Sequence, residues 1–186
     1  MAFRTSLSVR RLLASVVSIA ALSGSLLAGA GVADGATSAG RSCSYDLGTK
    51  SLVCVNAGED LNKAVLERQH VRVVVPSGAR GVTVRSAAVP DGALTTYVQT
   101  QLFDDVDYGG SFFQITNSSG CTGGTWYFGP LGDVGWSGRV SSFKSFSSCS
   151  TKLWQGTDYS GSSYGYTTSA TSLGTMNDRA NSVTMR

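Results

Sequence analysis

Hydrophobic and polar residues follow different patterns in different parts of the chain. Near the N-terminus, apolar and small side chains run on almost without interruption. At 59–69, the apolar residues Leu61, Val65 and Leu66 recur at helical spacing with charged residues between them, which predicts a helix. Beyond position 97, short apolar runs alternate with Gly, Ser, Asn and Asp, which is typical of many short strands joined by tight turns.

Residues 37–96 are predicted to form a small α+β segment around that helix. The stretch from Cys43 to Cys54 has the pattern of a hairpin that turns at 47–50. The Pro-Asp-Gly sequence at 90–92 predicts a turn and a boundary to the next domain. Further strands are expected at 71–75 and 82–85.

The N-terminal apolar run has the features of a secretory signal peptide. Three arginines and no acid precede it, and it ends in the small residues that signal peptidase accepts, at Ala30 or at Ala36. We therefore expect residues 1–36 to be a cleaved signal peptide. The mature protein is then secreted, extracellular and without a membrane attachment. An uncleaved anchor helix is the alternative, because the run is about long enough to span a bilayer.

Loss of the signal peptide changes what the charge of the chain implies. The full chain carries 15 basic and 12 acidic side chains. Cleavage after Ala36 removes three arginines and one aspartate and leaves 12 basic against 11 acidic side chains. Such a nearly neutral protein has no stripe of Lys and Arg, so we expect no nucleic-acid binding.

The four cysteines, Cys43, Cys54, Cys121 and Cys149, indicate disulfides rather than a metal site. An even number behind a signal peptide predicts two bridges, for which three pairings are possible. We favour Cys43–Cys54 and Cys121–Cys149, because each pair then lies within one half of the mature chain. Zinc is disfavoured, since no two cysteines have the usual close spacing and the chain has a single histidine.

Residues 97–186 contain an internal repeat. Leu102-Phe103, Tyr108-x-Gly110 and a following aromatic recur 51 positions later as Leu153-Trp154, Tyr159-x-Gly161 and a further aromatic. Each copy also has a late serine, Ser142 in the first and Ser182 in the second. This spacing predicts a hairpin folded over its own sheet, with the aromatics beneath it, the glycine at a positive φ and the serine bonded to its backbone. Two such units pair, because one alone leaves an apolar face in water.

The repeat resembles the Greek-key motif of the βγ-crystallin family, in its aromatic-x-Gly signature and its late serine. The resemblance covers about 85–90 residues. It implies a mainly β fold, a two-motif Greek-key β-sandwich at 97–186, preceded by the small disulfide-stapled α+β segment. We expect a monomer.

The resemblance also implies a calcium site. Family members that bind calcium share the stretch N/D-N/D-x-x-S/T-S in each motif and exchange ligands between the two. The second stretch here begins Asn177-Asp178, and the first ends Ser141-Ser142, so Asn177, Asp178 and Ser141 together predict one weak site. Ser137 and Asn181 form the degraded opposite site, where Gly138 replaces an oxygen ligand. The alternative is that both stretches only close turns.

No motif in the sequence predicts catalysis, so we expect a protein that is not an enzyme. A histidine-dependent triad would have to use His70, which lies between the predicted helix and a strand. The acidic residues Asp104, Asp105 and Asp107 are expected at the polar tip of a folded hairpin.

A protein target is the leading alternative function. The same fold resembles that of secreted metallopeptidase inhibitors, which gives the leading alternative function. It also resembles that of killer-toxin-like proteins, which gives a third. The segment at 117–130 contains a cysteine and the aromatic triplet Trp126, Tyr127 and Phe128, which fits a disulfide-held loop that binds a secreted peptidase or another protein. The other interpretation is a strand that completes the domain. Likewise, the alternating Tyr164 and Tyr166 are expected to pack across a sheet, with a sugar-binding face as the alternative.

Overall fold

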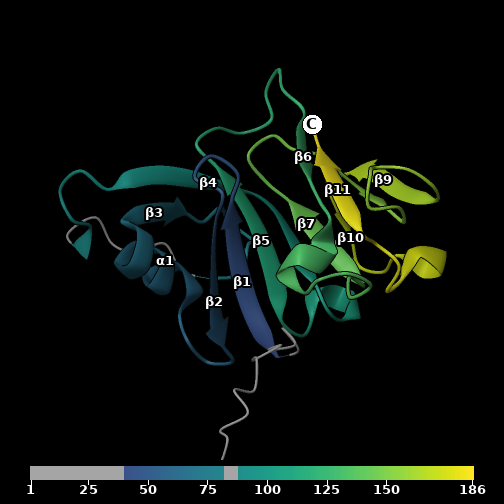
Figure 1. The fold of residues 1–186 in the computed structure, drawn as a ribbon, viewed down its shortest axis with the longest axis horizontal. Coiled ribbons are helices and arrows are strands. Elements are labelled where there is room, and N and C mark those ends of the chain that lie inside the picture. Colours follow the sequence, from purple (N-terminus) through teal and green to yellow (C-terminus); the bar gives the residue numbers. More distant parts are fainter. Residues whose placement is uncertain (1–39, 82–87) are drawn as a thin grey trace, which may run out of the picture. The chain divides into compact units, whose positions relative to one another are not determined.

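The computed structural model describes residues 40–81 and 88–186, all of which lie in one compact unit (Figure 1). The predicted signal peptide and the strand expected at 82–85 lie outside the described residues. Within the described part of the chain, no helix is long and apolar enough to cross a membrane.

Two sheets form the body of this unit (Figure 1). The seven-stranded sheet has the order β10-β7-β4-β5-β1-β2, with β3 beside β4, and the four-stranded sheet has the order β6-β11-β8-β9. The strands of the first sheet are β1 (Arg41–Asp46), β2 (Ser51–Asn56), β3 (Val71–Val74), β4 (Leu94–Phe103), β5 (Phe112–Asn117), β7 (Ser142–Ser145) and β10 (Ser169–Ala170). Those of the second are β6 (Trp126–Phe128), β8 (Thr151–Trp154), β9 (Ser163–Thr167) and β11 (Ser182–Met185).

The two copies of the repeat exchange one strand each. The first copy supplies β4 to β7 and the second β8 to β11, yet β6 pairs with β11 and β10 pairs with β7. The third strand of each copy therefore lies in the sheet of the other copy. This exchange makes a two-motif Greek-key sandwich, and it confirms the mainly β fold predicted from the repeat.

The core between the two sheets is formed by residues that alternate along the strands. From the seven-stranded sheet Leu102, Phe113 and Phe143 point inward, and Leu153 and Val183 meet them from the four-stranded sheet, all 0% exposed. The neighbours of Leu102 and Phe113 in the chain point to the opposite face, as the twofold periodicity of a strand requires.

The N-terminal segment forms a third layer on that opposite face. Its hairpin β1–β2 extends the sheet through parallel pairing of β1 with β5, and helix α1 (Leu61–Gln69) contacts β1, β2 and β3. A second apolar core results, in which Val98, Phe103 and Phe112 of the sheet pack with Leu61 and Val65 of the helix. The segment is therefore packed on the sandwich and is not a separate module.

Local signals explain where α1 begins and ends. Asp60 caps its N-terminus by accepting hydrogen bonds from the backbone N–H groups of Asn62 and Lys63, both at 3.0 Å. His70 ends it in the left-handed conformation, with φ 55°, and its N–H donates to the carbonyl of Leu66. The histidine is therefore a helix cap.

Buried amides connect the third layer to the seven-stranded sheet. Gln114 donates to Ser44 Oγ at 2.9 Å and to Asn62 Oδ1 at 2.8 Å. Gln101 binds the backbone of Arg80 on both sides, accepting from its N–H at 2.7 Å and donating to its carbonyl at 2.8 Å. Because each of these buried polar groups has partners, their contacts fix one packing of the segment on the sheet.

A buried carboxylate makes a further connection at the other end of β1. Asp46 is 6% exposed and accepts hydrogen bonds from Thr49 N at 2.8 Å, Thr96 Oγ1 at 2.6 Å and Thr116 Oγ1 at 2.9 Å. Burial by itself raises the pKa of Asp46, but the hydrogen bonds from Thr96, Thr49 and Thr116 together outweigh it. The net result is a pKa lowered below its ordinary value.

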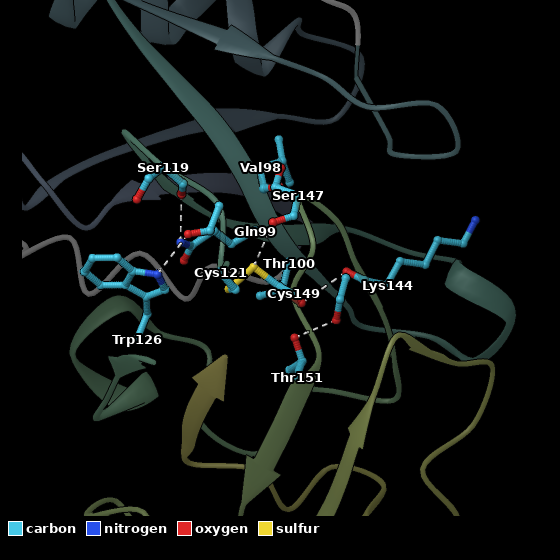
Figure 2. Close-up of a disulfide and its surroundings, with 12 residues drawn as sticks. Val98, Gln99, Thr100, Ser119, Cys121, Trp126, Lys144, Ser147, Cys149 and Thr151 are labelled. Atoms are coloured by element: carbon cyan, nitrogen blue, oxygen red, sulfur yellow. Dashed lines mark hydrogen bonds between the residues drawn. A yellow bond between two sulfur atoms is a disulfide. The ribbon is translucent and has the colours of Figure 1, made fainter. Parts of the chain in front are cut away.

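Two disulfides join Cys43 to Cys54 and Cys121 to Cys149, which are the pairs that the sequence favours. The first closes the β1–β2 hairpin, whose turn falls at the expected position. The second lies between the segment that leads to β6 and the loop that leads to β8. Figure 2 shows its surroundings, in which Gln99 donates to the carbonyl of Ser119 at 3.1 Å.

Candidate functional site

A serine holds the folded hairpin of each repeat. Ser142 Oγ donates to the carbonyl of Asp105 at 2.6 Å and accepts from the backbone N–H of Tyr108 at 3.0 Å. In the second copy Ser182 Oγ makes the same two contacts, to the carbonyl of Gly156 at 2.7 Å and from the N–H of Tyr159 at 3.1 Å. The role expected for these serines is therefore confirmed.

The folded hairpins differ in how their aromatic residues pack. In the first copy Phe103 and Tyr108 meet edge to face with ring centroids 5.7 Å apart, as predicted. In the second copy Tyr159 instead packs on Tyr127 of β6, at 5.2 Å. Partial burial, and then the neighbouring Tyr127, raise the pKa of Tyr159 above its ordinary value. The glycines of both signatures have the expected positive φ, 68° at Gly110 and 77° at Gly161.

The two stretches with calcium-ligand character lie against each other. The N–H of Asp178 donates to the carbonyl of Val140 at 3.0 Å, and the N–H of Gly138 donates to the carbonyl of Ala180 at the same distance. Asp178 and Gly138 occupy equivalent positions of the two stretches, and both have a left-handed backbone, with φ of 54° and 64°. Side chains of one copy are thereby placed beside those of the other.

The structure brings the three residues of the predicted site together. Ser141 Oγ lies 3.1 Å from Asp178 Oδ1, and the amide of Asn177 donates to Asp178 Oδ2 at 2.7 Å. The carboxylate of Asp178 is exposed and its pairing with Ser141 crosses between the copies. Calcium prefers hard oxygen ligands, and a carboxylate, a hydroxyl and a carboxamide oxygen are donors of that kind. The donor set thus fits calcium, with a single carboxylate to supply charge.

The opposite stretch is poorer in ligands. The hydroxyl of Ser137 donates to Asn181 Oδ1, and the amide of Asn181 donates to the carbonyl of Gln155 at 2.7 Å. No carboxylate takes part, and Gly138 contributes no side chain. Across residues 40–81 and 88–186, no three His, Cys, Asp or Glu side chains gather in a way that could hold a metal.

One ion pair near these stretches was not predicted from the sequence. Arg139 donates to both carboxylate oxygens of Asp104, from Nε at 2.9 Å and from Nη2 at 2.5 Å, and its guanidinium stacks on Trp136 at 4.3 Å. The sequence places Asp104 at a polar hairpin tip and predicts no partner for it. The available signal was the difference between the copies, because the second copy has Gln155 where the first has Asp104.

The aromatic triplet forms strand β6 and completes the four-stranded sheet. Phe128 is 8% exposed and stacks on Phe113, with ring centroids 5.4 Å apart. Trp126 is partly buried and its indole N–H donates to the carbonyl of Gly120 at 3.3 Å (Figure 2). Tyr127, in contrast, is 56% exposed. Of the two interpretations of the triplet, this arrangement is the strand that completes the domain.

The exchange of third strands, the serine-held hairpins and the paired stretches all occur in one domain. Its fold is that of the βγ-crystallins. No model of a known protein family matches the chain, and no curated protein matches it. Solved structures that resemble this βγ-crystallin fold include a mutant of a βγ-crystallin domain from Clostridium beijerinckii, at 16% identity and a TM-score of 0.39.

Two further solved structures are similar. The N-terminal domain of protein S is 15% identical with a TM-score of 0.39, and a βγ-crystallin from Ciona intestinalis is 24% identical with a TM-score of 0.37. These three matches cover 46–47% of this chain and 94–95% of the structures compared. The matched proteins thus correspond to about half of the chain.

Proposed function

We propose that this chain is an extracellular, non-catalytic βγ-crystallin-type protein that is stabilised by one weakly bound calcium ion at Asn177, Asp178 and Ser141. The observation that carries the proposal is the approach of Ser141 Oγ to Asp178 Oδ1, 3.1 Å across the two copies. An ion bound there contacts both copies at once. It therefore stabilises the folded sandwich relative to the unfolded chain.

The composition of the site sets its affinity. Calcium affinity rises with the number of charged ligands, and this site has one carboxylate. We therefore expect a dissociation constant in the range of extracellular calcium modules, about 10⁻⁴–10⁻³ M. The two disulfides support an oxidising, extracellular location, where calcium concentrations are high enough for such a site.

Thermal unfolding with calcium and with EDTA tests the proposal. At about 100 times the dissociation constant, one ion adds about 2.7 kcal/mol to the free energy of unfolding. For a folded unit of this size that raises the midpoint by roughly 5–10 °C. Asp178→Ala should abolish the calcium-dependent rise. Ser137→Ala, a matched serine on the opposite stretch, should leave it intact. A rise that persists in Asp178→Ala would refute the assignment, as would the absence of a rise in the unmodified protein.

A peptidase inhibitor on the same fold is the second candidate, and the exposure of Tyr127 favours it. This side chain is 56% exposed on β6, which is an edge strand of the four-stranded sheet. Edge strands with an exposed aromatic residue can pair with an extended peptide. The test is a panel of secreted metallopeptidases, with Tyr127→Ala as the variant. No inhibition at micromolar protein would exclude this function.

A further inference from the structure

The outer face of the four-stranded sheet carries aromatic rings that are held in fixed positions. Thr184 of β11 is 1% exposed, and its Oγ1 accepts a hydrogen bond from the indole N–H of Trp154 at 3.1 Å. The same oxygen lies 2.9 Å from the hydroxyl of Tyr166. Because one buried hydroxyl binds the polar tips of both rings, their orientation on the face is set by the sheet beneath them.

Two cations lie on these rings. Lys152 Nζ is 3.8 Å from the centre of the Trp154 ring and 5.8 Å from that of Tyr166. The guanidinium of Arg186 stacks on the same Tyr166 ring at 3.8 Å. The backbone of Arg186 is fixed as well, through hydrogen bonds of 2.7 and 3.0 Å with Ser150. Tyr166 therefore holds both positive charges close together.

Neither cation has an acidic partner in the described chain. The ion pairs present among residues 40–81 and 88–186 join Lys63 to Glu67 and Arg139 to Asp104. No acidic side chain of the described residues therefore forms an ion pair with Lys152 or Arg186. Aromatic faces hold them in place, and this reduces the entropy that binding of an anion has to overcome.

A bulge in β9 places Tyr166 in line with the other residues of the face. Leu153 pairs with Tyr164 and Thr151 with Thr167, so two residues of β9 lie opposite the single residue Lys152. Pairing across the other strands aligns Lys152 with Thr184 and Thr184 with Tyr127. These side chains form a row across four strands, roughly 14 Å long at the usual spacing between strands.

We propose that this row is a binding site for an acidic polysaccharide. The carboxylates of such a polymer pair with Lys152 and Arg186, and the guanidinium can donate two parallel hydrogen bonds to one carboxylate. Its sugar rings pack their apolar faces on the ring of Tyr127, which is 56% exposed. A single-stranded nucleic acid is a poorer match, because proteins bind one in a positively charged groove that follows its backbone, and two cations in one row do not form such a groove.

Binding of polygalacturonate, with its fully methyl-esterified form as control, tests the proposal. The two polymers have the same sugar chain, and the ester removes the charge. EDTA is present throughout, so the outcome does not depend on the calcium site. We expect binding to polygalacturonate that weakens with salt, and none to the ester. Lys152→Gln and Arg186→Gln should each weaken binding about fivefold, as expected for an exposed ion pair at its upper strength.

The matched control is Lys144→Gln. Lys144 also stacks on a tyrosine, Tyr108, at 4.2 Å, but it belongs to β7 of the other sheet, and this substitution should leave binding unchanged. Melting temperatures of all variants establish that they are folded. Equal binding to the ester, full binding by a variant that carries both Lys152→Gln and Arg186→Gln, or tighter binding of an oligo-dT strand than of polygalacturonate would each overturn the proposal. The absence of binding to polygalacturonate would do the same.

Discussion

The carboxylate of Asp46 provides a quantitative test of how the N-terminal segment is attached to the sandwich. It accepts hydrogen bonds from both the backbone N–H and the hydroxyl of Thr49, and from the hydroxyls of Thr96 in β4 and Thr116 in β5. Hydrogen bonds to a charged group contribute more than neutral ones, because the charge strengthens each of them. The same carboxylate therefore connects strands β1, β4 and β5.

The perturbation is Asp46→Asn, which keeps the size of the side chain and removes its charge. An amide has one acceptor oxygen, so its NH₂ group must face donors that the carboxylate accepted. The threonine hydroxyls can rotate to accept from it, whereas a backbone N–H cannot. We expect a loss of about 2–3 kcal/mol in the free energy of unfolding, the usual range for hydrogen bonds to one buried charge. For a unit of this size that lowers the melting temperature by roughly 5–10 °C.

The pH dependence follows from the lowered pKa of Asp46. A carboxyl group whose pKa is lower in the folded than in the unfolded state stabilises the protein at pH values above its unfolded pKa of about 3.9. That stabilisation disappears as the pH falls through the folded pKa. The difference in melting temperature between the unmodified protein and Asp46→Asn should therefore be constant above about pH 5 and shrink in more acidic solution.

Thermal unfolding followed by circular dichroism between pH 2.5 and 7 is the assay. Asp91→Asn is the matched control, because Asp91 is exposed in a turn. The reasoning is wrong if Asp46→Asn melts within about 1 °C of this control at pH 7. It is also wrong if the difference between them grows as the solution is acidified.

Three further predictions test separate parts of the fold. Ser142→Ala and Ser182→Ala should each lower the free energy of unfolding by about 1–3 kcal/mol in chemical denaturation, because each leaves a backbone N–H and a carbonyl without the hydroxyl that binds them. Gly120→Ala should destabilise strongly, since a Cβ there would lie 2.2 Å from a carbonyl oxygen, whereas Gly124→Ala should be tolerated, its nearest neighbour being at 3.7 Å. A fragment of residues 97–186 should be far less stable than the longer chain and should bind a hydrophobic dye, because it exposes the apolar face that α1 covers.

Within the sandwich, the features that the sequence predicted are those encoded in the repeat. The spacing of aromatic, glycine and serine residues is short-range, and each position has a chemical reason that does not depend on the rest of the molecule. Ser142 and Ser182 bind the folded hairpins for that reason. The approach of Ser141 to Asp178 was implied by the resemblance to the βγ-crystallins, in which the two stretches exchange ligands.

The packing of the N-terminal segment was not predictable in the same way. Gln114 lies between the apolar residues Phe113 and Ile115, and Gln101 directly precedes Leu102, which is typical of residues on a face exposed to water. Both are 0% exposed, since their partners are supplied by β1, by α1 and by the backbone of Arg80, at least 21 positions away. Burial that depends on distant polar partners leaves no periodicity in the sequence.

The third layer has a consequence for how the two halves of the duplication can diverge. Equivalent positions of the two copies are now in different environments. Gln101 is buried beneath the N-terminal segment, while its counterpart Lys152 lies on an uncovered face of the other sheet. A substitution at Gln101 has to fit a buried site, whereas one at Lys152 has only to suit the environment of the protein surface. A saturation scan should therefore find tolerance at outward-facing positions of the second copy and intolerance at the same positions of the first.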